Sequence, residues 1–174
     1  MPAAKPYRRG VGIVLVNARG RVFVAERIDT PGAWQMPQGG IDKNETPRQA
    51  ALRELREETG TTAAKIIAVT RNWLRYDFPA ELTSRKGWIA KYRGQEQKWF
   101  LMKFAGRDEE IDIAGEQPEF SAWTWAKLED VPEMIVGFKR DIYKKVVEAF
   151  KDDVAALRPK RKRAARKTPP RVRR

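Results

Sequence analysis

The 174-residue sequence predicts an α+β fold, in which a mixed β-sheet lies between helices as an α-β-α sandwich. Two patterns predict this class: seven short segments have the apolar character of strands, and two longer segments have helix signals. We therefore expect one domain over residues 1–157. Residues 158–174 lack apolar periodicity and contain three prolines, so we expect a disordered basic tail there.

The segments expected to form strands are apolar runs or alternate apolar with polar residues. They cover residues 10–17, 21–26, 34–36, 65–69, 72–77, 98–104 and 120–125. Residues 39–45 contain two glycines, and residues 85–97 are polar and basic, so both stretches are expected to be loops. Four tryptophans fall in strand patterns and are expected in the core: Trp73, Trp99, Trp123 and Trp125.

The first helix has start and stop signals that agree with one another. Thr46 is suited to the N-cap, Pro47 to the first helical position, and Gln49 to closing a capping box. Good helix formers fill residues 50–58, and Gly60 is suited to ending the helix. The sequence therefore predicts a helix between Thr46 and Gly60.

A second helix is predicted over residues 138–157. Ile142, Val146, Phe150 and Val154 recur at every fourth position, which places them on one face of a helix. We expect this face to pack on the sheet, and the chain to leave the helix after Leu157.

The net charge of +13 is concentrated at the end of the chain. Residues 158–174 hold ten of the 36 Lys and Arg residues and no acidic residue, which leaves 26 basic and 23 acidic residues in 1–157. The sequence thus describes a nearly balanced domain with a basic tail. Such a tail is suited to nucleic acid, although a solvated extension or a contact to ribosomes or membranes has the same composition.

Composition also excludes several kinds of chemistry. The chain has no cysteine and no histidine, so disulfides, thiolate or imidazole metal sites and Ser-His-Asp catalysis are excluded. Proton transfer is left to carboxylates, lysine, tyrosine or metal-bound water. Neither a signal-peptide core nor a run of about 20 apolar residues is found, so we expect a cytoplasmic protein.

The first predicted helix carries three carboxylates on one face. Glu54, Glu57 and Glu58 stand at positions i, i+3 and i+4, where they repel one another unless a cation lies between them. Oxygen ligands without His or Cys favour Mg²⁺ or Mn²⁺ over zinc. Taken alone, the same acids also fit a solvated face neutralised by Arg53 and Arg56.

The segment before this helix favours the metal site. Glycines at 39 and 40 allow the backbone to approach an anion closely, and the helix N-terminus favours negative charge there. Loop and helix together read Gly39-x5-Glu45-x7-Arg53-Glu54-Leu55-x-Glu57-Glu58-x-Gly60. This string resembles the Nudix box. The resemblance implies a loop-helix-loop motif in an α-β-α sandwich, which binds a divalent metal and hydrolyses nucleoside diphosphates linked to another group.

The resemblance also implies roles for individual residues. Metal ligands would be Gly39, Glu54, Glu57 and Glu58, the three glutamates forming the catalytic set, with Glu54 also a possible general base. The residues that hold the motif together would be Glu45, Arg53 and Gly60. Thr61 departs from the aliphatic residue that the family usually has there.

Further segments resemble one Nudix subfamily, which contains the bacterial RNA pyrophosphohydrolases and the asymmetric diadenosine polyphosphate hydrolases. These segments are Tyr7-Arg8, Trp34-Gln35-x-Pro37-Gln38-Gly39-Gly40, residues 71–76, residues 97–100 and residues 138–141. By this resemblance Glu119 would be a fourth carboxylate ligand. Substrate would be bound by Arg8, Arg27, Gln38, Lys139 and Phe138.

Each of these side chains also has a plain structural interpretation. The cations suit a triphosphate, but each one alone fits a surface cation, and Glu119 fits an exposed loop acid. Phe138 fits stacking on a nucleobase and equally fits anchoring the last helix.

The function that follows from the resemblance is a Mg²⁺-dependent RNA pyrophosphohydrolase, which converts 5′-triphosphorylated RNA to 5′-monophosphorylated RNA and pyrophosphate and so promotes decay. The alternative is hydrolysis of diadenosine tetra- or pentaphosphate to ATP and a smaller nucleotide. A third hypothesis is an RNA-binding module without catalysis, which the complete set of carboxylates disfavours.

Overall fold

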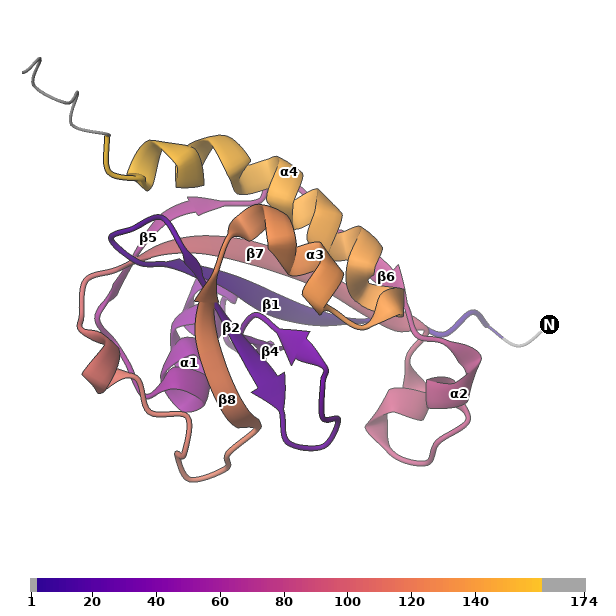
Figure 1. The fold of residues 1–174 in the computed structure, drawn as a ribbon. Helices are drawn as coiled ribbons and strands as arrows, with labels where there is room; N and C mark the ends of the chain where they lie inside the picture. The colour runs from indigo at the N-terminus through magenta and orange to yellow at the C-terminus, as the bar shows by residue number, and fades with distance from the viewer. Residues whose placement is uncertain (1–2, 161–174) are drawn as a thin grey trace, which may run out of the picture.

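The computed structural model describes residues 3–160, and in this part of the chain an eight-stranded mixed sheet lies between helices (Figure 1). The strands are β1 (Tyr7–Val16), β2 (Val22–Arg27), β3 (Trp34–Gln35), β4 (Gln38–Gly40), β5 (Ala64–Val69), β6 (Leu74–Asp77), β7 (Gly94–Phe104) and β8 (Phe120–Ala126). The α-helices are α1 (Pro47–Thr59), α2 (Ala80–Thr83), α3 (Val131–Met134) and α4 (Arg140–Leu157). The 3₁₀ turns are η1 (Trp88–Lys91), η2 (Asp108–Glu110), η3 (Leu128–Asp130) and η4 (Gly137–Lys139).

The sheet is built around β1 and β7, which run parallel and pair along ten residues. Its main strand order is β3-β2-β1-β7-β5, with β4 also on β1, β6 on β7 and β8 on β2. All pairs other than β1 with β7 are antiparallel. The α+β class, the mixed sheet and the α-β-α layering predicted from the sequence are therefore confirmed.

Both faces of the sheet are buried, and β1 shows how. Val11, Ile13 and Leu15 belong to the core under α1, whereas Val14 and Val16 belong to the core under α4. This alternation follows from the two-residue period of a strand. A Cβ at Gly12 would lie 2.4 Å from the Trp99 ring, so only glycine fits there.

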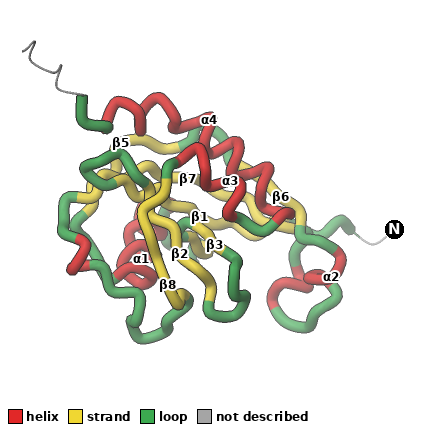
Figure 2. The backbone as a smooth tube through the Cα atoms, in the orientation of Figure 1, coloured by secondary structure: helices red, strands yellow, loops and turns green. Residues whose placement is uncertain are grey.

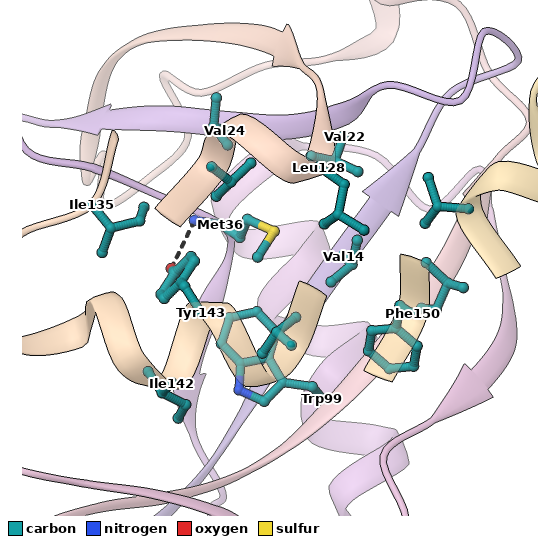
Figure 3. Close-up of a cluster of buried hydrophobic side chains, with 14 of the residues drawn as sticks. Val14, Val22, Val24, Met36, Trp99, Leu128, Ile135, Ile142, Tyr143 and Phe150 are labelled. Carbon is teal, nitrogen blue, oxygen red and sulfur yellow. Dashed lines mark hydrogen bonds between the residues drawn. The ribbon is translucent and has the colours of Figure 1, made fainter. Parts of the chain in front are cut away.

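Helix α4 packs as its sequence period predicts. Ile142, Val146, Phe150 and Val154 are all buried against the sheet, which confirms the predicted stripe. Figure 3 shows this core, in which the Tyr143 hydroxyl accepts a hydrogen bond of 3.0 Å from the Met36 backbone N–H. That bond ties α4 to the segment between β3 and β4.

The capping signals of α1 are confirmed. The Gln49 N–H donates to the Thr46 hydroxyl, and the Thr46 N–H donates to the Gln49 side chain, so the capping box is complete. Gly60 ends the helix in the left-handed conformation, with φ of 69°, and its N–H donates to Arg56. Local sequence is therefore sufficient to set both ends of α1.

Several predicted boundaries were wrong. Residues 38–40 form β4, and β7 begins at Gly94 instead of Lys98, because these polar residues pair with β1 and, for β7, with β6 on its other edge. Within the expected loop 85–97, residues 88–91 form η1. Helix α4 begins at Arg140, and residues 137–139 before it form a 3₁₀ turn. For β4 and β7, pairing with neighbouring strands set the ends, and no apolar pattern in the sequence records this pairing.

The expected positions of the tryptophans were partly correct. Trp99 is buried, whereas Trp123 and Trp125 are half-buried against the core under α1, and Trp73 is half-buried outside both core clusters. Trp125 Nε1 reaches outward to the Asp108 carboxylate at 3.1 Å.

The residue after α4, Arg158, belongs to the tail that was expected to be disordered, and the structure describes its contacts. Arg158 packs against Gly20 and pairs with Glu129 at 2.7 Å, so the packed part of the chain includes this residue. The rest of the expected disordered tail, residues 161–174, lies outside the described residues. None of the helices within residues 3–160 combines the length and the hydropathy that spanning a bilayer requires.

Candidate metal and phosphate site

Arg53 connects the glycine loop to α1. Its Nε and Nη2 donate to the two Glu45 oxygens at 2.8 and 2.9 Å, and Nη2 also donates to the Gly40 carbonyl at 2.8 Å. Glu45 in turn accepts from the Asp42 N–H, and the Arg53 guanidinium holds the pKa of Glu45 below its usual range. A bidentate ion pair of this kind gives geometric precision to the loop that enters the helix.

The same guanidinium faces two of the three helix carboxylates. Arg53 Nη1 donates to Glu54 Oε1 at 2.7 Å and to Glu57 Oε2 at 3.1 Å. Arg53 therefore balances part of the negative charge on this face of α1.

Glu54 is buried against the glycine loop. A Cβ at Gly39 would lie 2.0 Å from the Glu54 carboxyl group, so the close approach requires glycine. Burial raises the pKa of Glu54 to about 7, with Glu57 and Glu119 acting in the same direction and Arg53 against them. At neutral pH this carboxyl can therefore either hold or release a proton.

Glu58 is still more deeply enclosed. Its Oε2 accepts from the Gln38 N–H at 3.0 Å, whereas Oε1 is buried and has no hydrogen-bond partner within residues 3–160. Burial raises the pKa of Glu58 well above its usual range, and Glu119 and Glu54 add to the effect. A buried carboxylate oxygen without a partner is costly unless a proton or a cation reaches it.

An open cavity of about 460 Å³ adjoins these groups, and acidic residues line it from two parts of the chain. From α1 come Glu54, Glu57 and Glu58, and from the loop before β8 come Glu116 and Glu119. Sequence reasoning missed Glu116, although an acid three residues before Glu119 was a usable signal. The cavity concentrates negative charge and fits a divalent cation with oxygen ligands.

The carboxylates line one cavity but do not surround a single metal position. Among the described residues, no group of three or more acidic side chains already surrounds one metal position. The reason lies in the contacts above: Glu54 and Glu57 are turned toward Arg53, and Glu119 is exposed.

Cations lie beside the buried carboxylate. Lys139, in η4, is 8% exposed, and burial lowers its pKa to about 8, with Arg27 acting in the same direction and Glu58 and Asp29 against it. Arg27 pairs with Asp29 and donates to Gln35 Oε1 at 3.2 Å. Two of the predicted substrate-binding cations are thus brought near Glu58.

The predicted residues Gln38, Arg8 and Phe138 lie around the same region. The Gln38 side chain accepts from Gln97 Nε2 at 2.7 Å. Arg8 Nη2 lies 2.2 Å from the point where a Cβ on Gly40 would stand. Phe138 is 38% exposed and packs against Tyr76 with ring centroids 6.1 Å apart, so part of its ring faces solvent.

Sequence reasoning missed a set of buried polar side chains here. These are Gln35, Tyr76, Gln95 and Gln97. Gln35 Nε2 and the Tyr76 hydroxyl have no hydrogen-bond partner in the part of the chain that is described. The usable signal was the pair of glutamines at alternate positions, 95 and 97, of a strand.

Comparison with known proteins decides the family. The NUDIX domain family matches residues 6–146, which includes the glycine loop, α1 and the first two turns of α4. The chain belongs to the Nudix family. Nudix proteins generally use a divalent metal such as Mg²⁺, in agreement with the acidic cavity on α1.

Relatives within the Nudix family agree with this assignment. An RNA pyrophosphohydrolase of Roseobacter denitrificans is 55% identical over 85% of this chain and 94% of its own, and one of Rhodospirillum rubrum is 52% identical over 83% and 87%. A solved C. elegans Ap4A hydrolase complex superimposes with a TM-score of 0.62 at 21% identity, over 84% of this chain and 98% of its own. The last likeness shows the shared fold.

Proposed function

We propose that this Nudix chain is a cytoplasmic, Mg²⁺-dependent RNA pyrophosphohydrolase, which converts 5′-triphosphorylated RNA to 5′-monophosphorylated RNA and pyrophosphate and so promotes RNA decay. The observation that carries the proposal is the proximity of opposite charges: Glu58 lines the acidic cavity, and the buried Lys139 and the side chain of Arg27 lie close enough to Glu58 for the charges to influence one another. Such a pair of surfaces suits a metal-bound polyphosphate. Two relatives above 50% identity that are named RNA pyrophosphohydrolases support it.

The residues that would hold the metal are Glu54, Glu57, Glu58, Glu119 and the Gly39 carbonyl. The unpartnered Glu58 oxygen and the shared negative charge of the cavity fit Mg²⁺, or Mn²⁺ with similar ligands. When bound, the ion supplies positive charge that stabilises the phosphate oxygens and eases deprotonation of water.

The protein side chains supply the remaining steps. Water attacks a phosphorus of the triphosphate, one phosphoanhydride P–O bond breaks, and pyrophosphate leaves with the bonding electron pair. We assign to Glu54 the role of accepting the proton of the attacking water; its pKa, which burial raises to about 7, is compatible with a base at neutral pH. Arg8, Arg27 and Lys139 bind phosphate oxygens, and Gln38 and its partner Gln97 orient them.

The second candidate is hydrolysis of diadenosine tetra- or pentaphosphate to ATP and a smaller nucleotide. It would use the same carboxylates and cations, and the exposed Phe138 ring would suit adenine as well as an RNA base. The hypothesis of an inactive RNA-binding module is disfavoured, because a pure binding module has no use for the buried, unpartnered Glu58 carboxylate.

A competition assay tests the proposal at fixed Mg²⁺ and salt concentrations. Triphosphorylated RNA and diadenosine tetraphosphate are offered together to the full chain, and pyrophosphate and ATP are measured. We expect a higher kcat/KM on RNA and release of pyrophosphate. Preference for the dinucleotide would replace the proposal with the second candidate, and absence of any metal-dependent hydrolysis would support the binding module.

The basic tail is proposed to recruit RNA. Residues 161–174 contain eight Lys and Arg residues, and phosphate contacts of this kind give affinity that is independent of sequence. A chain ending at Lys160 is the suitable comparison, because it keeps Arg158 and its contact to Glu129. We expect kcat/KM to fall on RNA and to stay unchanged on diadenosine tetraphosphate.

A further inference from the structure

A row of aromatic rings runs from η4 through β6 into the connection between β6 and β7, and the proposed chemistry leaves Phe78, Trp88 and Tyr92 unused. Ring centroids follow one another at 5.9 Å from Tyr76 to Phe78, 6.2 Å from Phe78 to Trp88 and 6.4 Å from Trp88 to Tyr92. At the other end Tyr76 lies 6.1 Å from Phe138. The two inner rings, Tyr76 and Phe78, are buried, whereas Phe138 and Trp88 are exposed. The row thus offers two exposed rings, one on each side of a buried pair.

Trp88 is held in place although half of its surface faces solvent. It lies in η1, within the small lobe that α2 and η1 form at one end of the sheet (Figure 2). The ring is 48% exposed; the Arg8 guanidinium covers one face at 4.3 Å from the centroid, and Phe78 meets it edge-on at 73°. An indole braced by a cation and a second ring, with surface left free, is a preorganised stacking platform.

Arg8 links this platform to the phosphate site. Its guanidinium contacts Trp88 and also abuts Gly40, whose carbonyl is bound by Arg53 of the catalytic motif. Burial raises the pKa of the Tyr76 hydroxyl, which has no partner within the described chain, and the charges of Arg8 and Arg27 act against this rise. A ligand whose phosphates meet Arg8 and Arg27 would therefore extend its next groups along the aromatic row.

We propose that Trp88 stacks on a nucleobase of the RNA substrate, further from the 5′ end than the base that meets Phe138. The proposal rests on the proposed function and names the part of the RNA that this site binds. Phe138 is the ring nearer the phosphate cations, since the Lys139 ammonium lies 6.0 Å from it, and Trp88 lies three rings along the row. Aromatic side chains bind single-stranded bases in this way without reading their sequence.

The test combines a variant of the platform with the removal of single bases from the RNA. Triphosphorylated six-nucleotide RNAs, each lacking the base at nucleotide 2, 3 or 4, are hydrolysed by the wild type and by Trp88→Ala. With intact RNA we expect Trp88→Ala to lower kcat/KM about tenfold, mainly through KM, and Trp88→Phe to restore most of it. In the wild type one abasic position should give a similar loss, and in Trp88→Ala that position should give no further loss.

Two outcomes would overturn the proposal. One is unchanged kcat/KM in Trp88→Ala. The other is a loss that adds to every abasic substitution equally, since a ring that only positions Arg8 would act on all substrates alike. Trp73→Ala is the matched control: this half-buried tryptophan also lies under cations, Arg9 at 5.0 Å and Lys98 at 5.9 Å, but outside the row, so all RNAs should respond as in the wild type.

A binding experiment separates this proposal from the proposed function. Tryptophan fluorescence is recorded while 5′-monophosphorylated RNA is added in the presence of Mg²⁺. We expect quenching in the wild type and in Trp73→Ala, and its loss in Trp88→Phe. If the chain hydrolyses no RNA, the proposed function fails, and the quenching still decides the stacking; equal quenching in the wild type and in Trp88→Phe would refute it.

Discussion

At the scale of single residues, Glu58 lowers the stability of the metal-free fold although it is a proposed metal ligand. Its buried Oε1 has no hydrogen-bond partner in the described chain, and burial raises its pKa well above the usual range. A carboxyl whose folded pKa is raised stabilises the fold while protonated, and this contribution is lost as pH rises from the unfolded value, about 4.5, toward the folded one. At neutral pH Glu58 therefore destabilises the metal-free protein.

The first prediction follows from this sign. Glu58→Gln should raise the free energy of unfolding of the metal-free protein at pH 7, by on the order of 1–3 kcal/mol, because Gln keeps an acceptor for Gln38 and removes the buried charge. The gain should shrink toward zero below pH 4.5. Thermal unfolding in a chelator across this pH range measures it, and a gain that does not depend on pH would contradict the cause given.

The same variant should lose hydrolysis and most of the stabilisation that Mg²⁺ gives the wild type. A ligand that binds only the folded state raises its stability, so the wild type should gain with added Mg²⁺ while Glu58→Gln gains little. Equal stabilisation of both proteins by Mg²⁺ would place the ion elsewhere.

A second prediction concerns Gly39, whose missing side chain leaves room for Glu54. In Gly39→Ala the new Cβ would stand 2.0 Å from the Glu54 carboxyl group and would push it away, so kcat should fall by about tenfold or more while the fold is kept. Steady-state kinetics and thermal unfolding check this. Gly137→Ala is the control, because its Cβ would meet nothing within 4 Å; a similar fall in kcat there would remove the steric explanation.

At the scale of elements, α1 is the part that its own sequence specifies most fully. The capping box of Thr46 and Gln49, Pro47 at the start and Gly60 at the end are all local signals, and the structure confirms each of them. Buried Ala50, Ala51 and Leu55 dock the helix on the sheet, and Glu54 and Glu58, which are also buried, reach the edge of this face and line the cavity.

The third prediction separates helix stability from the chemistry. Thr46→Ala removes the acceptor for the Gln49 N–H and should lower the free energy of unfolding by about 1 kcal/mol. Because the ion pair of Arg53 with Glu45 still holds loop and helix together, kcat at 25 °C should change less than twofold. Denaturant unfolding and kinetics measure the two effects, and a large fall in kcat would show that the cap itself orients the glutamates.

At the scale of the whole molecule, the distribution of charge matters most. Residues 1–157 are nearly balanced, and the excess of positive charge lies at the end of the chain. A fourth prediction follows: the logarithm of kcat/KM on RNA should fall with the logarithm of salt concentration, more steeply for the full chain than for the chain ending at Lys160. Parallel slopes would mean that residues 161–174 make no phosphate contacts.

The sequence by itself determined the fold class, the ends of α1, the buried stripe of α4 and the Nudix motif, because these depend on local periodicity and on residues close together in the chain. Only the tertiary structure decided that Gln95 and Gln97 belong to a strand, since β7 is held there by β1 and β6. It also decided that Glu116 joins the acidic cavity and that Trp88 lies beside Arg8. These neighbours are distant in the sequence: Gln97 pairs with Leu74, 23 positions away, Glu116 shares the cavity with Glu58, 58 positions away, and Trp88 lies beside Arg8, 80 positions away. Periodicity within one segment does not show which distant segments meet.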